Sequence, residues 1–410
     1  MLKKILIELL PASHGDCLII TLIDNDHKKH ILIDGGVFET YHNQLKERLK
    51  IMADRHEEIS LLVVTHIDQD HIEGVIEVLK DQLHLDKQKR LRINEVWHNS
   101  FRHLHFSKVD NTGVIEKTIL KGIIAAAKNK RCVNYKCENN EISARQGSTL
   151  AALLKAGGYS WNSSFNGNAI NYDYLRTVKF EGFKIRLLSP DTQKLMRLSK
   201  VWEKELNKKK FGFKISDDVL FEDAFEFSMF MQNESNDLNQ NQPIAKNAIR
   251  IEELINEDEI LDTSPTNGSS IAFILEYAGR KLLFLGDSHP EIVADHLEKL
   301  KEEHYELRFD LVKISHHGSK KNTNDRLLSL IDSFQYLIST DGKKHNHPDL
   351  VTLSKLLCRP STYTKKVIFN YYTDNAKRFQ NSELMDKYNY SFEFPRQEGS
   401  PVMIELREVD

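Results

Sequence analysis

The densest group of reactive side chains is the segment HIDQDH at 66–71, which carries His66, Asp68, Asp70 and His71. An apolar run (SLLVV) precedes it, and a helical spacing of apolar residues follows it. Imidazole and carboxylate groups at such a strand-to-helix corner can converge on one point, and they are the ligands of hydrolytic divalent-metal sites. The alternative is the acidic first turn of a helix, capped by Asp70, with its histidines on the surface. So many ligand-type residues in one short segment favour the metal site.

Further ligand-type side chains stand directly after other apolar runs, where strands are expected to end. Asp287 follows FLG, His316 and His317 follow VKIS, and His347 lies at the start of an expected helix. Taken alone, each has a structural interpretation as a helix cap, a packed core histidine or a loop residue. Their recurrence after strands favours one shared site, because the ends of strands in a sheet lie side by side.

The elements that must position these residues predict an α/β chain, built as a layered αββα sandwich. Runs of β-branched and apolar residues indicate strands, and two hairpins turn at Glu181-Gly182 and Ala278-Gly279. The expected strands and hairpins cover 17–23, 30–33, 60–64, 92–97, 178–188, 270–287, 311–314, 336–339 and 366–369. Apolar residues at helical spacing indicate helices at 41–52, 72–80, 113–127, 148–156, 195–210, 289–302, 325–331 and 348–357.

We expect one domain over 1–410 with two insertions, at about 100–177 and 191–265. The run QNESNDLNQNQPIAKN at 232–247 has almost no apolar content and is expected to be mobile. The chain has 57 Lys and Arg residues against 60 Asp and Glu residues, a formal net charge of -3. A protein that binds polyanions over its whole surface would be basic, so any nucleic-acid site here must be local.

Nothing in the sequence indicates secretion or insertion into a membrane. Cys17, Cys132, Cys137 and Cys358 form no CxxC pair, and we interpret them as reduced thiols rather than zinc ligands or disulfides. The N-terminal apolar run is too short and too interrupted for a signal peptide. No segment approaches the roughly 18 apolar residues of a membrane helix. We therefore expect a soluble, cytoplasmic protein with no membrane partner.

In their order along the chain, these motifs resemble the metallo-β-lactamase fold superfamily. They are most similar to the branch that contains the hydrolase domain of ComEC-type DNA-uptake proteins. The matching pieces are His14-Gly15-Asp16-Cys17, Asp34-Gly35-Gly36, the 66–71 segment, Asn267 to Ser270, Gly286-Asp287, Ser315 to Ser319 and His347-Pro348. The resemblance implies a four-layer αββα sandwich and a metal-dependent hydrolase, with two divalent ions in a groove at one sheet edge. The two insertions stay unmatched.

The resemblance also implies roles for single residues. Asp287 would bridge the two ions, and Asp34 would orient one of the loop ligands. Asp68 stands where a histidine is more usual, which makes the site richer in oxygen and favours Mn²⁺ over Zn²⁺. The histidine of the usual third motif is not evident near 189–190; His98 could replace it, or could be a loop residue. The implied metal ligands are thus His66, Asp68, Asp70, His71, Asp287, His316 and His98.

Such a site would attack its substrate with a metal-bound hydroxide, because a divalent ion lowers the pKa of bound water from about 15.7 towards ~7. Asp70 or Asp68 could orient this nucleophile. His347, His317 or Lys320 could stabilise the developing charge or protonate the leaving group.

The leading hypothesis for the substrate is a phosphodiester in a nucleic acid or a nucleotide. The similar branch is associated with DNA processing, and Lys320 and Lys321 follow the SHHGS motif. Other side chains that could contact phosphate or stack on bases are the basic runs at 128–131 and 208–210 and the aromatic residues Trp97, Trp161 and Tyr159. The second of these basic runs is more economically explained as a solvated helix end.

Two other functions stay open. One is hydrolysis of a small ester, a lactone or a nucleotide second messenger, which suits the negative net charge. The other is a regulatory subunit with a degenerate site, in a multi-component, defence-type complex with a protein partner. The full set of ligand-type residues argues against this last function, because a scaffold has no need of them.

Overall fold

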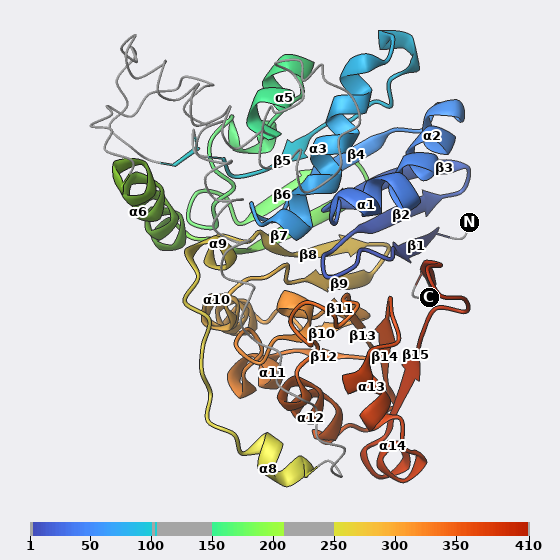
Figure 1. Ribbon diagram of the computed structural model, residues 1–410, viewed down its shortest axis with the longest axis vertical. Helices are drawn as coiled ribbons and strands as arrows, with labels where there is room; N and C mark the ends of the chain where they lie inside the picture. Colours follow the sequence, from blue (N-terminus) through green and yellow to red (C-terminus); the bar gives the residue numbers. More distant parts are fainter. Residues whose placement is uncertain (1–2, 101–102, 105–149, 209–249, 409–410) are drawn as a thin grey trace.

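The structure is a computed structural model that describes residues 3–100, 103–104, 150–208 and 250–408. The helix expected at 113–127, the polar run at 232–247 and the basic run at 128–131 lie outside the described residues. Two large β-sheets and the helices that cover them make up most of the described chain (Figure 1).

The first sheet combines both ends of the chain, with its six strands in the order β16-β1-β2-β3-β4-β5. Their bounds are β1 Lys3–Leu9, β2 Leu18–Asp24, β3 His27–Ile33, β4 Ile59–Val63, β5 Val96–Trp97 and β16 Val402–Arg407. The predictions of β2, β3 and β4 are confirmed, β5 is shorter than expected, and β1 and β16 are additions. Because β3 and β4 run parallel, their carboxyl ends lie at the same edge.

The second sheet has eight strands in the order β15-β14-β13-β11-β9-β8-β7-β6. Their bounds are β6 Thr177–Phe180, β7 Phe183–Ser189, β8 Ala272–Tyr277, β9 Arg280–Phe284, β11 Leu311–Lys313, β13 Gln335–Ile338, β14 Lys365–Phe369 and β15 Tyr390–Glu393. The two expected hairpins, β6–β7 and β8–β9, are confirmed. The neighbours β9, β11 and β13 run parallel, so their carboxyl ends also share an edge.

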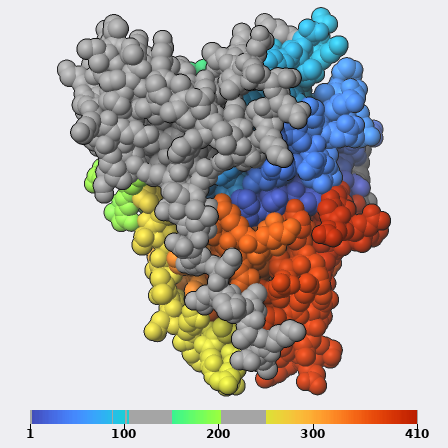
Figure 2. All heavy atoms as spheres, in the orientation of Figure 1, coloured from blue at the N-terminus to red at the C-terminus, as the bar shows by residue number. Residues whose placement is uncertain are grey.

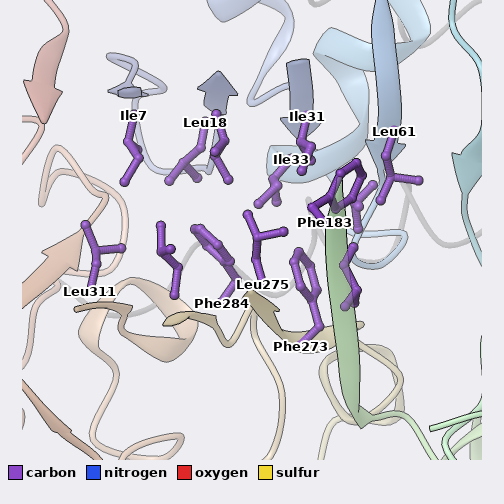
Figure 3. Packing of buried hydrophobic residues seen from close by; sticks show 14 of the residues in the cluster. Ile7, Leu18, Ile31, Ile33, Leu61, Phe183, Phe273, Leu275, Phe284 and Leu311 are labelled. Atoms are coloured by element: carbon purple, nitrogen blue, oxygen red, sulfur yellow. The ribbon is translucent and has the colours of Figure 1, made fainter. Parts of the chain in front are cut away.

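The two sheets face one another across a shared apolar core. Ile7, Ile31 and Leu61 project from the first sheet towards Phe273 and Phe284 of the second (Figure 3). All five side chains are buried. Burial of side chains of this size contributes roughly 1.5–3 kcal/mol each, so this layer fixes the position of one sheet on the other.

Helices cover the outer face of each sheet, and the predicted four-layer αββα sandwich is thereby confirmed (Figure 1). The helices on the first sheet are α1 Phe38–Thr40, α2 Lys46–Asp54, α3 Gln69–His84 and α5 Leu150–Gly157. Those on the second are α10 Pro290–Glu302, α11 Asp325–Leu330, α12 Leu350–Cys358, α13 Asp374–Phe379 and α14 Ser382–Tyr388. In the space-filling view the N-terminal and C-terminal halves of the chain meet along one boundary (Figure 2).

The described parts of the two expected insertions pack on this sandwich. In the first, α5 contacts α3. In the second, α6 (Thr192–Lys208) contacts α9 (Pro265–Gly268), and α8 (Ile251–Ile255) contacts α12. The segment between α8 and α9 therefore runs along the helices of the second sheet (Figure 1). Cys17 and Cys358 are free thiols, and among the described helices none is long and apolar enough to cross a membrane.

Candidate metal centre

The residues singled out in the sequence gather where strands of both sheets end. Asp34 follows β3, and the 66–71 segment follows β4. On the second sheet, Asp287 follows β9, the 315–319 segment follows β11, and His347 lies beyond β13. The centre thus lies at the seam between the two halves of the sandwich.

His71 is oriented by Asp34. Its Nδ1 lies 2.8 Å from Asp34 Oδ2, and both side chains are fully buried. Thr65 holds this carboxylate by donating from its backbone N–H and from its hydroxyl, each at 2.7 Å. A carboxylate acceptor places the imidazole hydrogen on Nδ1, so Nε2 of His71 presents a lone pair. This contact is the one that the family resemblance implies for Asp34.

His66 is oriented through the same hydroxyl. Its Nδ1 lies 3.1 Å from Thr65 Oγ1, whose own hydrogen goes to Asp34, so the ring donates and its Nε2 keeps a lone pair. That Nε2 lies 3.6 Å from Asp68 Oδ2. Asp68 occupies the N-cap position of α3, yet its side chain makes no capping bond. The alternative of a helix turn capped by Asp70 is therefore wrong, because Asp70 lies in the first turn of α3 and not at its N-cap.

Asp287 lies in the middle of the centre. Its Oδ2 is 3.8 Å from Nε2 of His66, 3.4 Å from that of His71, and 3.7 Å from those of both His316 and His317. The side chain of Asp287 is only 3% exposed. One carboxylate oxygen is thus shared by four imidazoles that come from two segments of the chain, 66–71 and 315–319.

A tight turn holds Asp287 in this place. Its backbone N–H donates to Ser270 Oγ at 3.0 Å. Gly286 precedes it with a φ of +51°, and a Cβ at Gly286 would lie 2.3 Å from that same serine oxygen. Because other residues adopt this φ at a cost and would also collide with the serine, the turn requires glycine.

Buried groups contact Nδ1 of His317 and hold its ring in place. Its Nδ1 lies 2.8 Å from the carbonyl oxygen of Ser339 and 3.5 Å from Asp16 Oδ1. The other oxygen of Asp16 pairs with the ammonium of Lys313, and both of these side chains are 2% exposed. With Nδ1 donating to the carbonyl, Nε2 is the nitrogen of His317 that could bind an ion, and it lies 3.4 Å from Asp70 Oδ2.

His316 faces the other side of Asp287. Its Nδ1 lies 2.7 Å from Asn322 Oδ1, and its side chain is 25% exposed. Left-handed backbone at both histidines, with φ of 47° and 56°, turns their rings to an interplanar angle of 70°. Two consecutive residues can therefore serve opposite sides of the same carboxylate.

The buried carboxylates of the cluster favour positive charge on the groups around them. Burial alone would lower the pKa of His317, but the carboxylates around it, Asp287 foremost, raise its pKa to about 10. The same opposition raises the pKa of His71 well above its usual value. Burial would raise the pKa of Asp70 and Asp287, but the neighbouring histidines lower both far below the ordinary range. The carboxylates are therefore ionised in a buried space.

This donor set fits divalent metal ions. Among the described residues, Nε2 of His66, His71 and His317 and Oδ1 of Asp287 are buried without a hydrogen-bond partner. In the described part of the chain, three groups bring their ligand atoms within 4.8 Å of one another: His66, His71 and Asp287; Asp70, His71 and His317; and Asp16, Asp34 and His71. Imidazole nitrogen with carboxylate oxygen is a ligand set of zinc and manganese, so these groups could hold such ions.

His98 lies apart from this convergence. It is fully buried, its ring stacks on Trp161 with centroids 6.1 Å apart, and it belongs to none of the ion-holding groups found in the described chain. Trp97, offered above for base stacking, has no exposed surface and packs edge-on against Phe165. That expectation is wrong for Trp97, because its position in β5 directs the ring into the core between the sheets.

His347 and Lys320, two of the residues expected to stabilise the developing charge or protonate the leaving group, have different surroundings. The ring of His347 lies 5.7 Å from that of His316, and its Nδ1 lies 3.5 Å from Asp349 Oδ1. The ammonium of Lys320 pairs with Glu257 instead of a carboxylate of the centre. The structure thus places His347 beside the centre and gives the charge of Lys320 another partner.

Some residues of the centre were not in the predicted metal set. Of the two consecutive histidines, the sequence predicts a ligand role for His316 alone. Nε2 of His317 nevertheless lies 3.4 Å from Asp70 Oδ2 and 3.7 Å from Asp287 Oδ2. Lys313 carried a signal that could have been used: a lysine in a buried strand requires an anion beside it. Asp262, which lies 3.8 Å from Nδ1 of His316, belongs to no recognisable motif.

Comparisons with known proteins give distant structural likeness only. No family model matches the sequence, and no curated protein matches it. A metallo-beta-lactamase fold protein, YhfI from Bacillus subtilis, aligns over 98% of this chain and 99% of its own, with a TM-score of 0.39 and 7% identity. A mutant of the CmlA beta-hydroxylase aligns over 98% of this chain and 54% of its own, with a TM-score of 0.33 and 11% identity. The description of the centre therefore rests on the geometry of this chain.

Proposed function

We propose that this protein is a metal-dependent hydrolase that cleaves phosphodiesters of nucleic acids or nucleotides with two divalent ions, Mn²⁺ or Zn²⁺. The observation that carries the proposal is the convergence of four imidazole Nε2 atoms on Asp287 Oδ2, at 3.4 to 3.8 Å. Beside the shared Asp287, one ion would be held by Asp70, His71 and His317, and the other by His66, Asp68 and His316. Such ions lower the pKa of water and neutralise charge on the group under attack.

Asp68 and Asp70 are the carboxylates of the centre that reach solvent. Their side chains are 20% and 19% exposed, whereas that of Asp287 is 3% exposed. A carboxylate at the mouth of the centre can accept a hydrogen bond from the attacking water and align it with the substrate. We assign this orienting role to Asp70 or Asp68.

His347 is the acid of the proposal. Its side chain is 12% exposed at the rim, next to the ring of His316. To act as an acid, His347 must carry hydrogens on both ring nitrogens: Asp349 faces the one on Nδ1, and Nε2 gives its own to the leaving oxygen, which leaves the ring neutral. The proton then passes from the ring to the alcohol that departs.

A phosphodiester suits the charge at the rim. Lys343 and Lys344 lie between β13 and His347 in the chain, so both cations belong to the segment that leads to His347. In the proposal, these two lysines contact the phosphate. The resemblance to DNA-uptake hydrolases favours the same substrate class.

The test is a cleavage panel with Mn²⁺ or Zn²⁺. Substrates are labelled single- and double-stranded DNA and RNA, a cyclic dinucleotide and a p-nitrophenyl carboxylic ester. Asp70→Asn is compared with Asp310→Asn, a matched substitution before β11, where Asp310 binds Arg280 at 2.6 Å away from the centre. We expect wild type and Asp310→Asn to cleave at least one phosphodiester, and Asp70→Asn to be slower by about 10²-fold or more.

Two results would contradict the proposal. Cleavage of the carboxylic ester alone would show a hydrolase of another substrate class. Failure to cleave any substrate, by protein shown to bind the ions, would remove the hydrolase function itself.

A further inference from the structure

We infer that Asp262, in the second insertion, is a positioning residue that sets His316 to bind an ion through Nε2. This inference rests on the ion centre of the proposed function. Asp262 lies in the segment 257–267, which we call the strap. Apart from Asn267 at its end, the strap belongs to none of the motifs named in the sequence analysis.

The strap is tied to the helices of the second sheet. Glu259 accepts from the ammonium of Lys355, in α12, at 2.9 Å. Further along, the backbone N–H of Asp262 donates to the carbonyl oxygen of Lys321 at 3.0 Å. Lys321 closely follows the SHHGS motif, so this contact brings the strap to the edge of the centre.

At that edge, the carboxylate of Asp262 acts only as an acceptor. Its Oδ2 accepts from the side-chain amides of Asn267 at 2.7 Å and Asn322 at 2.9 Å, and its Oδ1 accepts from Ser264 N at 2.8 Å. The side chain of Asp262 is 10% exposed. Burial would raise its pKa, but these N–H donors lower it, so the carboxylate is ionised.

Asp262 fixes which way the amide of Asn322 points. The Nδ2 of Asn322 faces Asp262 Oδ2 and also the backbone carbonyl oxygen of Asp287, at 3.1 Å. Both atoms accept hydrogen bonds only, so the amide nitrogen must occupy this side and the amide oxygen the other. Asn322 has no exposed surface, so water does not offer its amide an alternative.

The orientation of Asn322 in turn fixes the tautomer of His316. The amide oxygen lies 2.7 Å from Nδ1 of His316, and only a nitrogen that carries hydrogen can satisfy it. The Nε2 lone pair then faces Asp287 Oδ2 at 3.7 Å. A cation between these two acceptors relieves their repulsion. Asp34 keeps a hydrogen on Nδ1 of His71 by direct contact, and Asp262 keeps one on Nδ1 of His316 through the amide of Asn322.

The strap also contacts a second residue of the ion position that includes His316. Thr266 Oγ1 donates to Asp68 Oδ2 at 3.4 Å. His316 and Asp68 belong to one of the two proposed ion positions, and Asp70 and His317 belong to the other. The strap therefore supports one ion position selectively.

The test measures ion binding directly. Ion-free, full-length protein is titrated with Mn²⁺ alone and with Zn²⁺ alone by isothermal titration calorimetry. Asp262→Asn keeps the side-chain size but turns one acceptor oxygen into a donor, so it must oppose either Ser264 N–H or the amide of Asn322. We expect it to weaken one binding step by roughly 10- to 100-fold and to leave the other unchanged. The control Asp310→Asn should leave both steps unchanged.

A double variant separates positioning from a merely structural effect. If Asp262 acts through His316, then Asp262→Asn combined with His316→Gln binds ions no more weakly than His316→Gln alone. Independent, multiplicative weakening would overturn the inference, as would two unchanged binding steps in Asp262→Asn. Should Asp262→Asn fail to fold, Asn322→Ala removes the same link, and it is expected to lose the same step.

The failure of this inference can be told from the failure of the proposed function. If wild type binds two ions and cleaves no phosphodiester, the proposed substrate is wrong, and the titrations of Asp262→Asn still decide the inference. If wild type binds no ion, both are wrong.

Discussion

His316 and His317 are consecutive in the chain, yet their surroundings differ. The side chain of His317 is 3% exposed, and its Nδ1 meets Ser339 and Asp16. The side chain of His316 is 25% exposed, and its Nδ1 meets Asn322. We call the half of the centre that contains His317 the core half, and the half that contains His316 the strap half.

The two halves take their support from different parts of the molecule. The core half is supported by Asp16, just before β2, and by Lys313 in β11, so its geometry depends on the packing of the two sheets. The strap half is supported by Asp262, from an insertion. This difference suggests that the sandwich determines one ion position, while an inserted segment can adjust the other without disturbing the core.

Asp287 belongs to both halves, so its substitution should have the largest effect and remove the difference between them. Asp287→Asn takes away the charge that all four imidazoles face. We expect both binding steps to weaken by at least about 100-fold each, equivalent to roughly 2.7 kcal/mol per ion, and cleavage to be lost. Calorimetric titration with Mn²⁺ measures this, and one unaffected step would show that the carboxylate is not shared.

Removal of the ions should show how much each half contributes to the stability of the ion-bound protein. An ion that binds only the folded state stabilises it by about 2.7 kcal/mol when present at 100 times its Kd. We therefore expect wild type to gain about 5 kcal/mol from two ions, and Asp262→Asn to gain about 3–4 kcal/mol at the same ion concentration, because one of its binding steps is weakened. Thermal melts with Mn²⁺ and with a chelator measure the gain. Equal shifts in the two proteins would mean that the strap supports neither ion.

The buried pair of the core half should be the more costly one to break. Lys313 and Asp16 are both 2% exposed, and Lys313→Met leaves a buried carboxylate without its partner. We expect the free energy of unfolding of the ion-free protein to fall by about 3–5 kcal/mol, measured by denaturant titration. Lys313→Met combined with Asp16→Leu should recover most of this loss. A loss below about 1 kcal/mol would show that the pair does not support the core half.

An exposed anchor of the strap should matter least. The side chain of Glu259 is 38% exposed, so Glu259→Gln is expected to change stability by less than about 1 kcal/mol and to leave ion binding unchanged. Burial would raise its pKa, but the N–H of Asp325 and the ammonium of Lys355 lower it. The anchor is therefore present at neutral pH and is lost only as the pH falls below the ordinary carboxyl range. A large loss of ion binding in this variant would mean that the strap depends on one surface contact.

Most ligand-type residues of both halves could be predicted from the sequence, because their signals are local. The apolar run of β4 leads straight into the 66–71 segment, and that of β9 leads to Asp287. A strand pattern followed within a few residues by ligand-type side chains is sufficient to place those residues at a sheet edge. The tautomers of His66 and His71 were not predictable, since they depend on the hydroxyl of Thr65 and on Asp34.

The support of the strap half by Asp262 and the pairing of the outer strands depend on contacts between distant residues, which no local pattern reveals. Asp262 and Asn322 are 60 positions apart, and neither stands in a motif. His316 and His317 point in different directions because both have a left-handed backbone conformation. β16 alternates buried and exposed residues, a signal of a strand, but its pairing with β1 joins the two ends of the chain.

The most direct measurement is the anomalous scattering of Mn²⁺ in crystals of the ion-loaded wild-type protein. We expect two separate peaks that share Asp287, one beside Asp70 and His317 and the other beside Asp68 and His316, about 3.5–4 Å apart. A single peak on the His317 side would confine the metal chemistry to the core half and contradict the role given to the strap. The absence of any peak at Asp287 would contradict the metal centre itself.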